Sequence, residues 1–199
     1  MPAGTRDALV EAAARLLDEG GVAAVTLREV GHLAGVSHNA PYKHFADKRA
    51  LLAAIAAREL TEVGAALAGG TLGGRPATES LRAALHTYIT WALRHPARFK
   101  LVFGTWEGAS SAELGAAAAT TQRVFADLVA SAQHEGGLPH GDPVRLGSLL
   151  RALVHGAVDL ALAGHLAENG KGAARPDQLV DDLLGYLATH GEGWPRPRG

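Results

Sequence analysis

The sequence predicts an all-α protein built from a small N-terminal three-helix domain and a larger helical domain. Hydrophobic residues make up 47% of the 199 residues and aromatic residues only 5%, and this Ala-rich composition favours helices. Apolar residues recur at three- and four-residue spacing, whereas the sequence contains no alternating β-branched run that would indicate a sheet. Gly and Pro residues divide the chain into separate helical segments.

The first segment, 5–21, is expected to form a helix that ends at Gly20 and Gly21. One face of this helix is apolar and is expected to pack against the two helices that follow. The residues of that face are Leu9, Ala13, Leu16 and Leu17.

The next segment reads TLREVGHLAGVSHNAPYKHF and carries the signals of two short helices joined by a tight turn, a helix-turn-helix. Thr26 opens a capping box with Glu29, so a helix should begin there. Gly35 can adopt the positive φ that ends this helix, and Ser37 is expected to cap the second one. Pro41 removes at most the first hydrogen bond of the second helix, because the earlier N–H groups have no intrahelical partner.

The two short helices are expected to have distinct inner and outer faces. The first buries an apolar face made by Leu27, Val30 and Leu33, and the second turns Ala40 and Phe45 inward, with Tyr42 at the edge. The outward positions of the second helix carry groups that suit base edges and phosphates. These are His38, Asn39, Lys43 and His44.

The overall charge of the chain does not indicate a nucleic-acid partner. The net charge is -1 and the pI is near 6.8, and residues 1–50 hold six Lys and Arg against six Asp and Glu. Between residues 28 and 49, however, four cations stand against Glu29 and Asp47, a surplus of two (4 − 2). The positive charge is therefore local, and a dimer would double it.

Three further features connect this region to a known family. They are the GVS turn, Tyr42 and Phe45 spaced as Y-x-x-F, and Lys48 followed by Leu51-Leu52 at the start of the next helix. Residues 1–50 thereby resemble the DNA-binding domain of the TetR family of transcriptional regulators. More weakly, HPARFKLVF and LVHGAV resemble the TetR regulators whose C-terminal domain is named for a tryptophan and a His-Gly pair.

The resemblance assigns DNA contacts residue by residue. It implies that Ser37, Tyr42, His44 and Lys48 touch phosphates, and Thr26 at a helix start suits the same task. Capping and surface filling is the alternative for this set, and Ser37 and Thr26 are expected to be caps in either case. Base reading is assigned to Arg28, His38, Asn39 and Lys43, because Arg and Lys suit guanine and Asn suits adenine.

The remaining segments are placed from caps, breaks and periodicity. Helices are expected over 47–68, 78–95, 98–103, 111–135, 143–166 and 176–190. The predicted domains are 1–50 for DNA binding and 51–190 for ligand binding and dimerisation, followed by a disordered tail over 191–199.

The last two long helices carry more apolar residues than one core-facing stripe requires, which indicates a partner. TetR-like proteins pair these helices across a two-fold axis, so the resemblance implies a homodimer. Gly156, Ala157 and Ala161 are expected to permit close helix approach there. A charge at Leu184 or Ala157 is expected to give monomers.

Aromatic residues gather on both sides of the His95-Pro96 break and could line an apolar ligand pocket or fill the core. Both interpretations stay open. The residues are Tyr88, Trp91, Phe99, Phe103, Trp106 and Phe125. His155 and Asp159 lie four apart and could form a hydrogen-bonded pair that faces a cavity or a helix interface.

Several function classes are disfavoured. The chain has no Cys, and no two of its ten His residues stand four apart, so we expect neither a disulfide, a metal site nor a cofactor. The start lacks the pattern of a signal peptide, and no apolar run is long enough to span a membrane, which predicts a cytoplasmic protein.

These observations predict a homodimeric TetR-type repressor that binds a palindromic operator and is released by a small apolar or aromatic ligand. An all-helical enzyme using His155 and Asp159 is the alternative from another class, although no nucleophile, phosphate loop or metal set accompanies them. A transcriptional activator with the same DNA-binding domain also fits the sequence, as does a helical interaction module.

Overall fold

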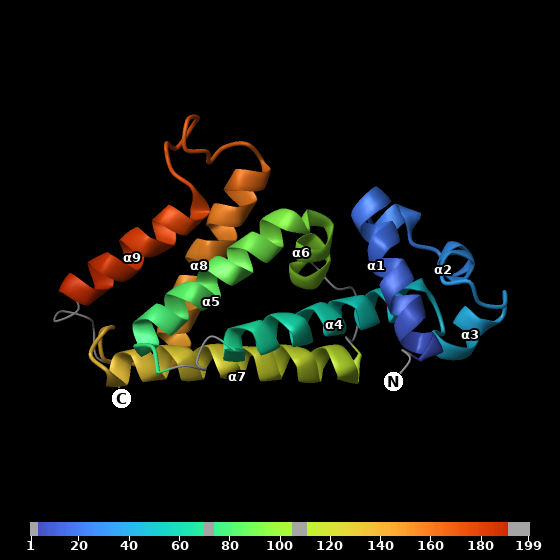
Figure 1. Cartoon of the computed structure of the whole chain (residues 1–199), viewed down its shortest axis with the longest axis horizontal. Coiled ribbons are helices and arrows are strands. Elements are labelled where there is room, and N and C mark those ends of the chain that lie inside the picture. The colour runs from blue at the N-terminus through green and yellow to red at the C-terminus, as the bar shows by residue number, and fades with distance from the viewer. Residues whose placement is uncertain (1–3, 70–73, 105–110, 191–199) are drawn as a thin grey trace. The chain divides into compact units, whose positions relative to one another are not determined.

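The computed structural model describes residues 4–69, 74–104 and 111–190, and these residues fold into helices α1 to α9 (Figure 1). The helices are α1 (Thr5–Ala24), α2 (Leu27–Leu33), α3 (Ala40–His44), α4 (Lys48–Gly69), α5 (Ala77–Arg94), α6 (Pro96–Phe103), α7 (Ala112–His134), α8 (Pro143–Leu162) and α9 (Pro176–His190). Outside the helices, one isolated bridge joins Ala167 to Gly172 in the described chain. The all-α prediction is confirmed.

The chain forms two compact units. The first takes its described residues from Met1–Glu62 and His95–Ala119, which include α1, α2, α3, α6 and the beginnings of α4 and α7. The second takes them from Val63–Arg94 and Thr120–Gly199, which include α5, α8, α9 and the ends of α4 and α7.

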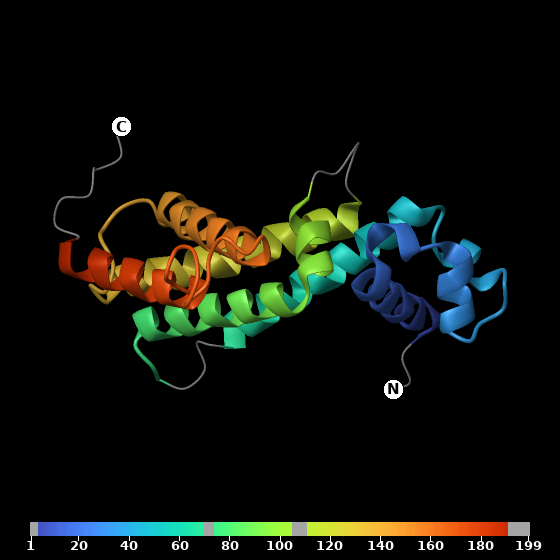
Figure 2. The same cartoon turned by 90° about the horizontal axis from the view of Figure 1, so that it is seen from above.

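The first unit is built on α1, which packs against α2, α3 and α6 (Figure 2). The predicted break at Gly20 and Gly21 is confirmed, because both residues leave helical backbone angles and Gly21 has a φ of 65°. The side chains that fill this core are fully or almost fully buried. They are Leu9, Ala13, Leu17, Val25, Val30, Phe45, Leu51 and Ile55.

Two predictions about the helix-turn-helix are wrong. Ser37 does not cap α3, which begins at Ala40 with Asn39 in the cap position. A cap at Ser37 would need its carbonyl to accept a bond from residue 41, but Pro41 has no N–H, so the Ser37 carbonyl accepts from Ala40 in a turn instead. Leu33, predicted to lie in the apolar face, is 40% exposed in this chain.

In the second unit, α5, α8 and α9 pack on one another. Each helix contributes a buried apolar stripe at the expected three- and four-residue spacing. Large buried members of these stripes are Leu81, Leu85 and Ile89 on α5, Leu146, Leu150, Val154 and Val158 on α8, and Val180 and Leu184 on α9.

Helix α8 ends at Leu162, four residues before the predicted end. Gly164 adopts a φ of +74°, and the N–H groups of Gly164 and His165 bond back to the carbonyls of Ala161 and Leu160. This is the Schellman arrangement, in which a left-handed glycine closes a helix. The apolar Leu166 after it extended the sequence pattern beyond the true end.

Candidate nucleic-acid interface and effector site

The helix-turn-helix is held together by local caps and one close contact. Thr26 Oγ1 accepts the backbone N–H of Glu29 at 3.2 Å and so begins α2. Gly35, with a φ of +66°, ends it as predicted. Gly31 of α2 lies against the ring of Pro41 in α3, where a Cβ on Gly31 would stand 2.8 Å from Pro41 Cγ. The two short helices can therefore approach closely only because residue 31 is glycine.

The structure places the predicted DNA-contact residues on the surface of this unit. Phe45 is buried beneath them as predicted, whereas Tyr42 is 53% exposed, and the partner ring of Tyr42 is His38, with centroids 6.0 Å apart. Lys48, the first residue of α4, is half-buried. The exposed residues of the set are Thr26, Arg28, Ser37, His38, Asn39, Tyr42, Lys43 and His44.

Part of the aromatic set comes together in the second unit. Tyr88 on α5 stacks on the His155 ring of α8 with centroids 5.5 Å apart, and its ring centroid lies 5.8 Å from that of Trp91. Tyr88 is buried, while Trp91 and His155 are half-buried. The half-buried ring of Phe125 on α7 lies instead beside Gly147 of α8, where an added Cβ would meet it at 3.4 Å.

The ring nitrogens of His155 have two hydrogen-bonding partners. Its Nδ1 lies 3.1 Å from the Arg151 carbonyl, which can only accept, and the Tyr88 hydroxyl lies 3.1 Å from Nε2 and 3.3 Å from Nδ1. Burial lowers the pKa of His155 and raises the pKa of Tyr88 above its ordinary range. The exposed Asp159 acts on His155 as a charge that partly offsets this shift.

The other aromatic candidates belong to the first unit or lie outside the described residues. Phe99 is buried on α6 and its ring centroid is 5.5 Å from that of Phe103, which is 39% exposed. Trp106 lies outside the described residues, as does the tail over 191–199.

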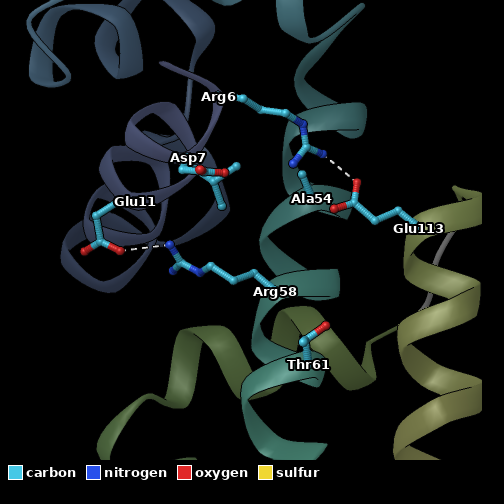
Figure 3. Close-up of a pocket in the computed structure, with 8 residues that line it drawn as sticks. Arg6, Asp7, Glu11, Ala54, Arg58, Thr61 and Glu113 are labelled. Atoms are coloured by element: carbon cyan, nitrogen blue, oxygen red, sulfur yellow. Dashed lines mark hydrogen bonds and ion pairs between the residues drawn. The ribbon is translucent and has the colours of Figure 1, made fainter. Parts of the chain in front are cut away.

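Sequence reasoning missed a cleft of about 450 Å³ in the first unit, shown in Figure 3. It lies between α1, α4 and the start of α7, and two arginine ion pairs cross it in opposite directions. Arg6 of α1 reaches Glu113 of α7 at 2.5 Å, and Arg58 of α4 reaches Glu11 of α1 at 2.8 Å. The partners are 107 and 47 residues apart in the chain, so no local pattern could have joined them. The lining residues are Arg6, Asp7, Val10, Glu11, Ala54, Arg58, Thr61 and Glu113.

The described residues contain no cluster of three or more His, Asp or Glu side chains that could hold a metal ion. No described helix combines the length and the apolar character that crossing a membrane requires.

Comparison with known families accounts for both parts of the chain. The family model described as bacterial regulatory proteins, tetR family, matches residues 9–55, and the model described as tetracyclin repressor-like, C-terminal domain, matches residues 81–187. The chain belongs to the TetR family. It is a TetR-type transcriptional regulator with a helix-turn-helix DNA-binding domain. The finer subtype indicated by HPARFKLVF and LVHGAV stays a prediction.

Solved structures of similar fold cover nearly the whole TetR-family chain. A protein of unknown function from Rhodococcus sp. RHA1 is 28% identical with a TM-score of 0.80, over 94% of this chain and 95% of that one. The SmeT–triclosan complex is 23% identical with a TM-score of 0.66, over 98% and 99%; SmeT is the repressor of a Stenotrophomonas maltophilia multidrug efflux pump. AibR, solved with isovaleryl coenzyme A and operator DNA, is 19% identical with a TM-score of 0.64, over 92% and 98%. A search of curated protein sequences found no match.

Proposed function

We propose that this TetR-family regulator is a cytoplasmic repressor that binds a palindromic operator as a homodimer and leaves it when a small apolar or aromatic ligand binds. Residues 1–50 serve as the DNA-binding domain and residues 51–190 as the ligand-binding and dimerisation domain. The observation that carries this proposal is the row of exposed polar side chains around α3, supported from beneath by the buried Phe45.

In the proposed complex, α3 of each protomer lies in the major groove. His38, Asn39 and Lys43 face base edges, with Arg28 of α2 beside them, while the remaining candidate residues bind phosphates. The phosphate contacts are Thr26, Ser37, Tyr42, His44 and Lys48. A two-fold dimer would present its reading helices to successive major grooves, about 34–36 Å apart.

The proposed dimer surface is a second apolar stripe on α8. Leu149, Leu153, Gly156 and Leu160 follow one another at spacings of four, three and four residues, which places them on one helical face. Leu149 is 46% exposed and Leu160 is 48% exposed, so this face is separate from the buried stripe of α8. Large exposed apolar residues on one face favour a partner, and a second copy of the chain would cover them.

Leu184 and Ala157, the sites expected from the sequence to break a dimer, are buried within the chain at 0% and 4% exposure. A charge there would therefore act on the fold of one protomer. Gly156 is the better probe, since a Cβ on it meets nothing within 4 Å. We predict that Gly156→Arg keeps the helical fold but elutes as a monomer, while the control Gly115→Arg, at an equally open α7 glycine, stays dimeric. If the Gly156→Arg protein is still a dimer, this stripe is not part of the dimer interface.

For effector binding we propose the aromatic residues Tyr88, Trp91 and Phe125 of the second unit, together with His155 and Asp159 of α8. SmeT was solved in complex with triclosan and AibR with isovaleryl coenzyme A, which supports a small effector with an apolar part here. A ligand that favours a spacing of the reading helices unsuited to DNA would shift the population toward the unbound form.

We also propose that the chain is not an enzyme. Both family models that match the chain describe regulatory proteins, which supports this proposal over an enzyme that uses His155 and Asp159.

Selection of duplexes from a random DNA library by the purified full-length chain tests the proposed operator, together with gel shifts on the DNA upstream of its own gene. We expect one palindromic sequence to be enriched, and enrichment of no sequence would overturn specific recognition.

For the effector, a Trp194→Phe protein is titrated with triclosan and other hydrophobic probes. Quenching of the remaining Trp emission together with release of the selected duplex supports the site, and neither effect with any probe would refute it.

A further inference from the structure

A carboxylate with no solvent exposure lies at the centre of the first unit. Glu59 of α4 is 0% exposed, and its Oε1 accepts hydrogen bonds from Arg58 Nη2 and Arg98 Nη1, each at 3.0 Å. A buried charge is costly unless it is paired, and the guanidinium groups of Arg58 and Arg98 offset the cost of burying Glu59. Arg58 is a neighbour on α4, whereas Arg98 comes from α6, 39 residues away in sequence.

The same two arginines also bind α1. Arg98 Nε lies 3.0 Å from both oxygens of Asp18 and Arg98 Nη2 lies 2.6 Å from Oδ2, a bidentate pair. Arg58 Nη1 binds Glu11 Oε2 at 2.8 Å. Glu11 and Asp18 are seven residues apart, two helical turns, and so share one face of α1. We call these five residues, Glu11, Asp18, Arg58, Glu59 and Arg98, the Glu59 network.

The network alternates in charge and begins and ends on α1. Its Arg98 side chain is only 13% exposed. Burial opposes the charge of this guanidinium, but the hydrogen bond with Asp18 and the charges of Glu59, Asp18 and Glu11 outweigh it and raise the pKa of Arg98. The Arg98 guanidinium therefore keeps its positive charge within the network.

The network holds α1, and the DNA-binding helices α2 and α3 pack on α1. α1 packs against α2, α3 and α6, and a rigid helix tied at two points two turns apart can neither slide nor rotate freely. α6 also carries Phe99 and Phe103, two of the aromatic residues that the sequence predicts for ligand binding or core packing. A shift of α6 by a ligand would pull Arg98 away from Asp18, Glu59 or both.

We propose that the Glu59 network positions α1, and with it the helix-turn-helix, relative to α6, and that Arg98 is the residue through which a movement of α6 reaches the DNA-binding helices. This inference rests on the proposed function for its DNA-binding consequence. It assigns Arg98, Asp18 and Glu59 as positioning residues, because none of them belongs to the proposed DNA-contact set.

The test uses Asp18→Asn in the full-length chain. This change removes the bidentate partner on α1 but leaves Arg98 paired with the buried Glu59, so the fold should survive. The matched control is Asp177→Asn, which breaks a similar bidentate pair with Arg175 in the second unit, where Nε lies 3.0 Å from Oδ1 and Nη2 lies 2.8 Å from Oδ2. Glu113→Gln is a second control, because it frees Arg6 of α1 without touching the network. Asp18→Glu restores the charge.

Amide hydrogen exchange gives a readout that does not depend on DNA. We expect faster exchange in α1, α2 and α3 for Asp18→Asn, unchanged exchange in α8 and α9, and recovery in Asp18→Glu. Exchange in α1 to α3 that equals that of the wild-type chain would overturn the proposal. Equal acceleration in Asp177→Asn or Glu113→Gln would also overturn it, because the effect would then be general.

Binding to the selected duplex gives the functional readout, at matched concentrations of folded protein. We expect Asp18→Asn to lose about 5- to 150-fold in affinity for the selected duplex, the usual range for coupled sites, and to lose less for random DNA. Equal losses on both would refute a positioning role in recognition. If the wild-type chain selects no duplex, the proposed function fails, while the exchange result still decides the link between α6 and α1.

Discussion

Replacement of Gly31 by alanine tests the contact that holds α2 against α3. The added Cβ would lie 2.8 Å from Pro41 Cγ and 3.4 Å from Cδ. Carbon atoms in good contact are about 3.5–4.0 Å apart, so the shortfall is about 0.7 Å or more. A proline ring cannot rotate out of the way as a flexible side chain would, and α2 and α3 must therefore separate.

Two effects of opposite sign contribute to the free energy of unfolding. Glycine inside a helix costs about 0.5–1 kcal/mol relative to alanine, so the substitution gains that amount. Overpacking of a close contact costs about 1–3 kcal/mol. The control Gly115→Ala in α7 makes the same exchange where a Cβ meets nothing within 4 Å, and it should show the gain alone. The difference between the two variants therefore isolates the contact, at about 1–3 kcal/mol in favour of Gly115→Ala.

Thermal unfolding followed by circular dichroism measures this difference. For a domain of about 150–250 residues, 1 kcal/mol shifts the Tm by about 2–4 °C, so we expect Gly31→Ala to melt about 2–12 °C below Gly115→Ala. Affinity for the selected duplex should also fall in Gly31→Ala, since α3 is displaced from its support. Equal melting temperatures would refute the close approach of α2 and α3.

Two other predictions follow from named groups. Lys48→Ala should weaken binding to all DNA and reduce the slope of log affinity against log salt by about 0.9 for each phosphate that the variant no longer neutralises. An unchanged salt slope in Lys48→Ala would contradict the phosphate assignment. Asn39→Ala should instead mainly relax base preference, by about 1–3 kcal/mol. Burial lowers the pKa of His155 in the folded chain, so the unfolded chain binds the proton more tightly. The contribution of neutral His155 to the free energy of unfolding is therefore complete above about pH 6.5. It is lost as the pH falls below that value. Urea unfolding at several pH values checks this, and a His155→Gln chain that loses stability over pH 5–6.5 as steeply as the wild type would show that another group is responsible.

The cleft and the Glu59 network share two residues, Glu11 and Arg58. The outer end of the network is thus open to solvent, while its centre at Glu59 is closed. High salt should therefore weaken the Arg58–Glu11 pair, whose glutamate side chain is 55% exposed, more than the Arg98–Glu59 pair, because screening acts on exposed charges.

Local backbone chemistry was determined by the sequence itself. Thr26 as a cap and Gly35 at the end of α2 each act on groups within about five residues. Their effect can therefore be read without knowing the fold. The spacing of apolar residues likewise determined which face of each long helix is buried, since burial of that face is the main source of helix stability in a folded protein.

Only the tertiary structure decided which charged groups meet. Glu59 sits in the stretch AAREL, where a glutamate beside an arginine has the pattern of a solvated helix surface. Its burial follows from the arrival of Arg98 on α6, and Arg98 in turn binds Asp18 from 80 residues away. The predicted cap at Ser37 is wrong for a related reason, because whether a serine caps a helix depends on where the helix can begin, and Pro41 moved that point to Ala40. Ion pairs act through space and not along the chain, so their partners are chosen only once the packing of α1, α4 and α6 has brought the groups together.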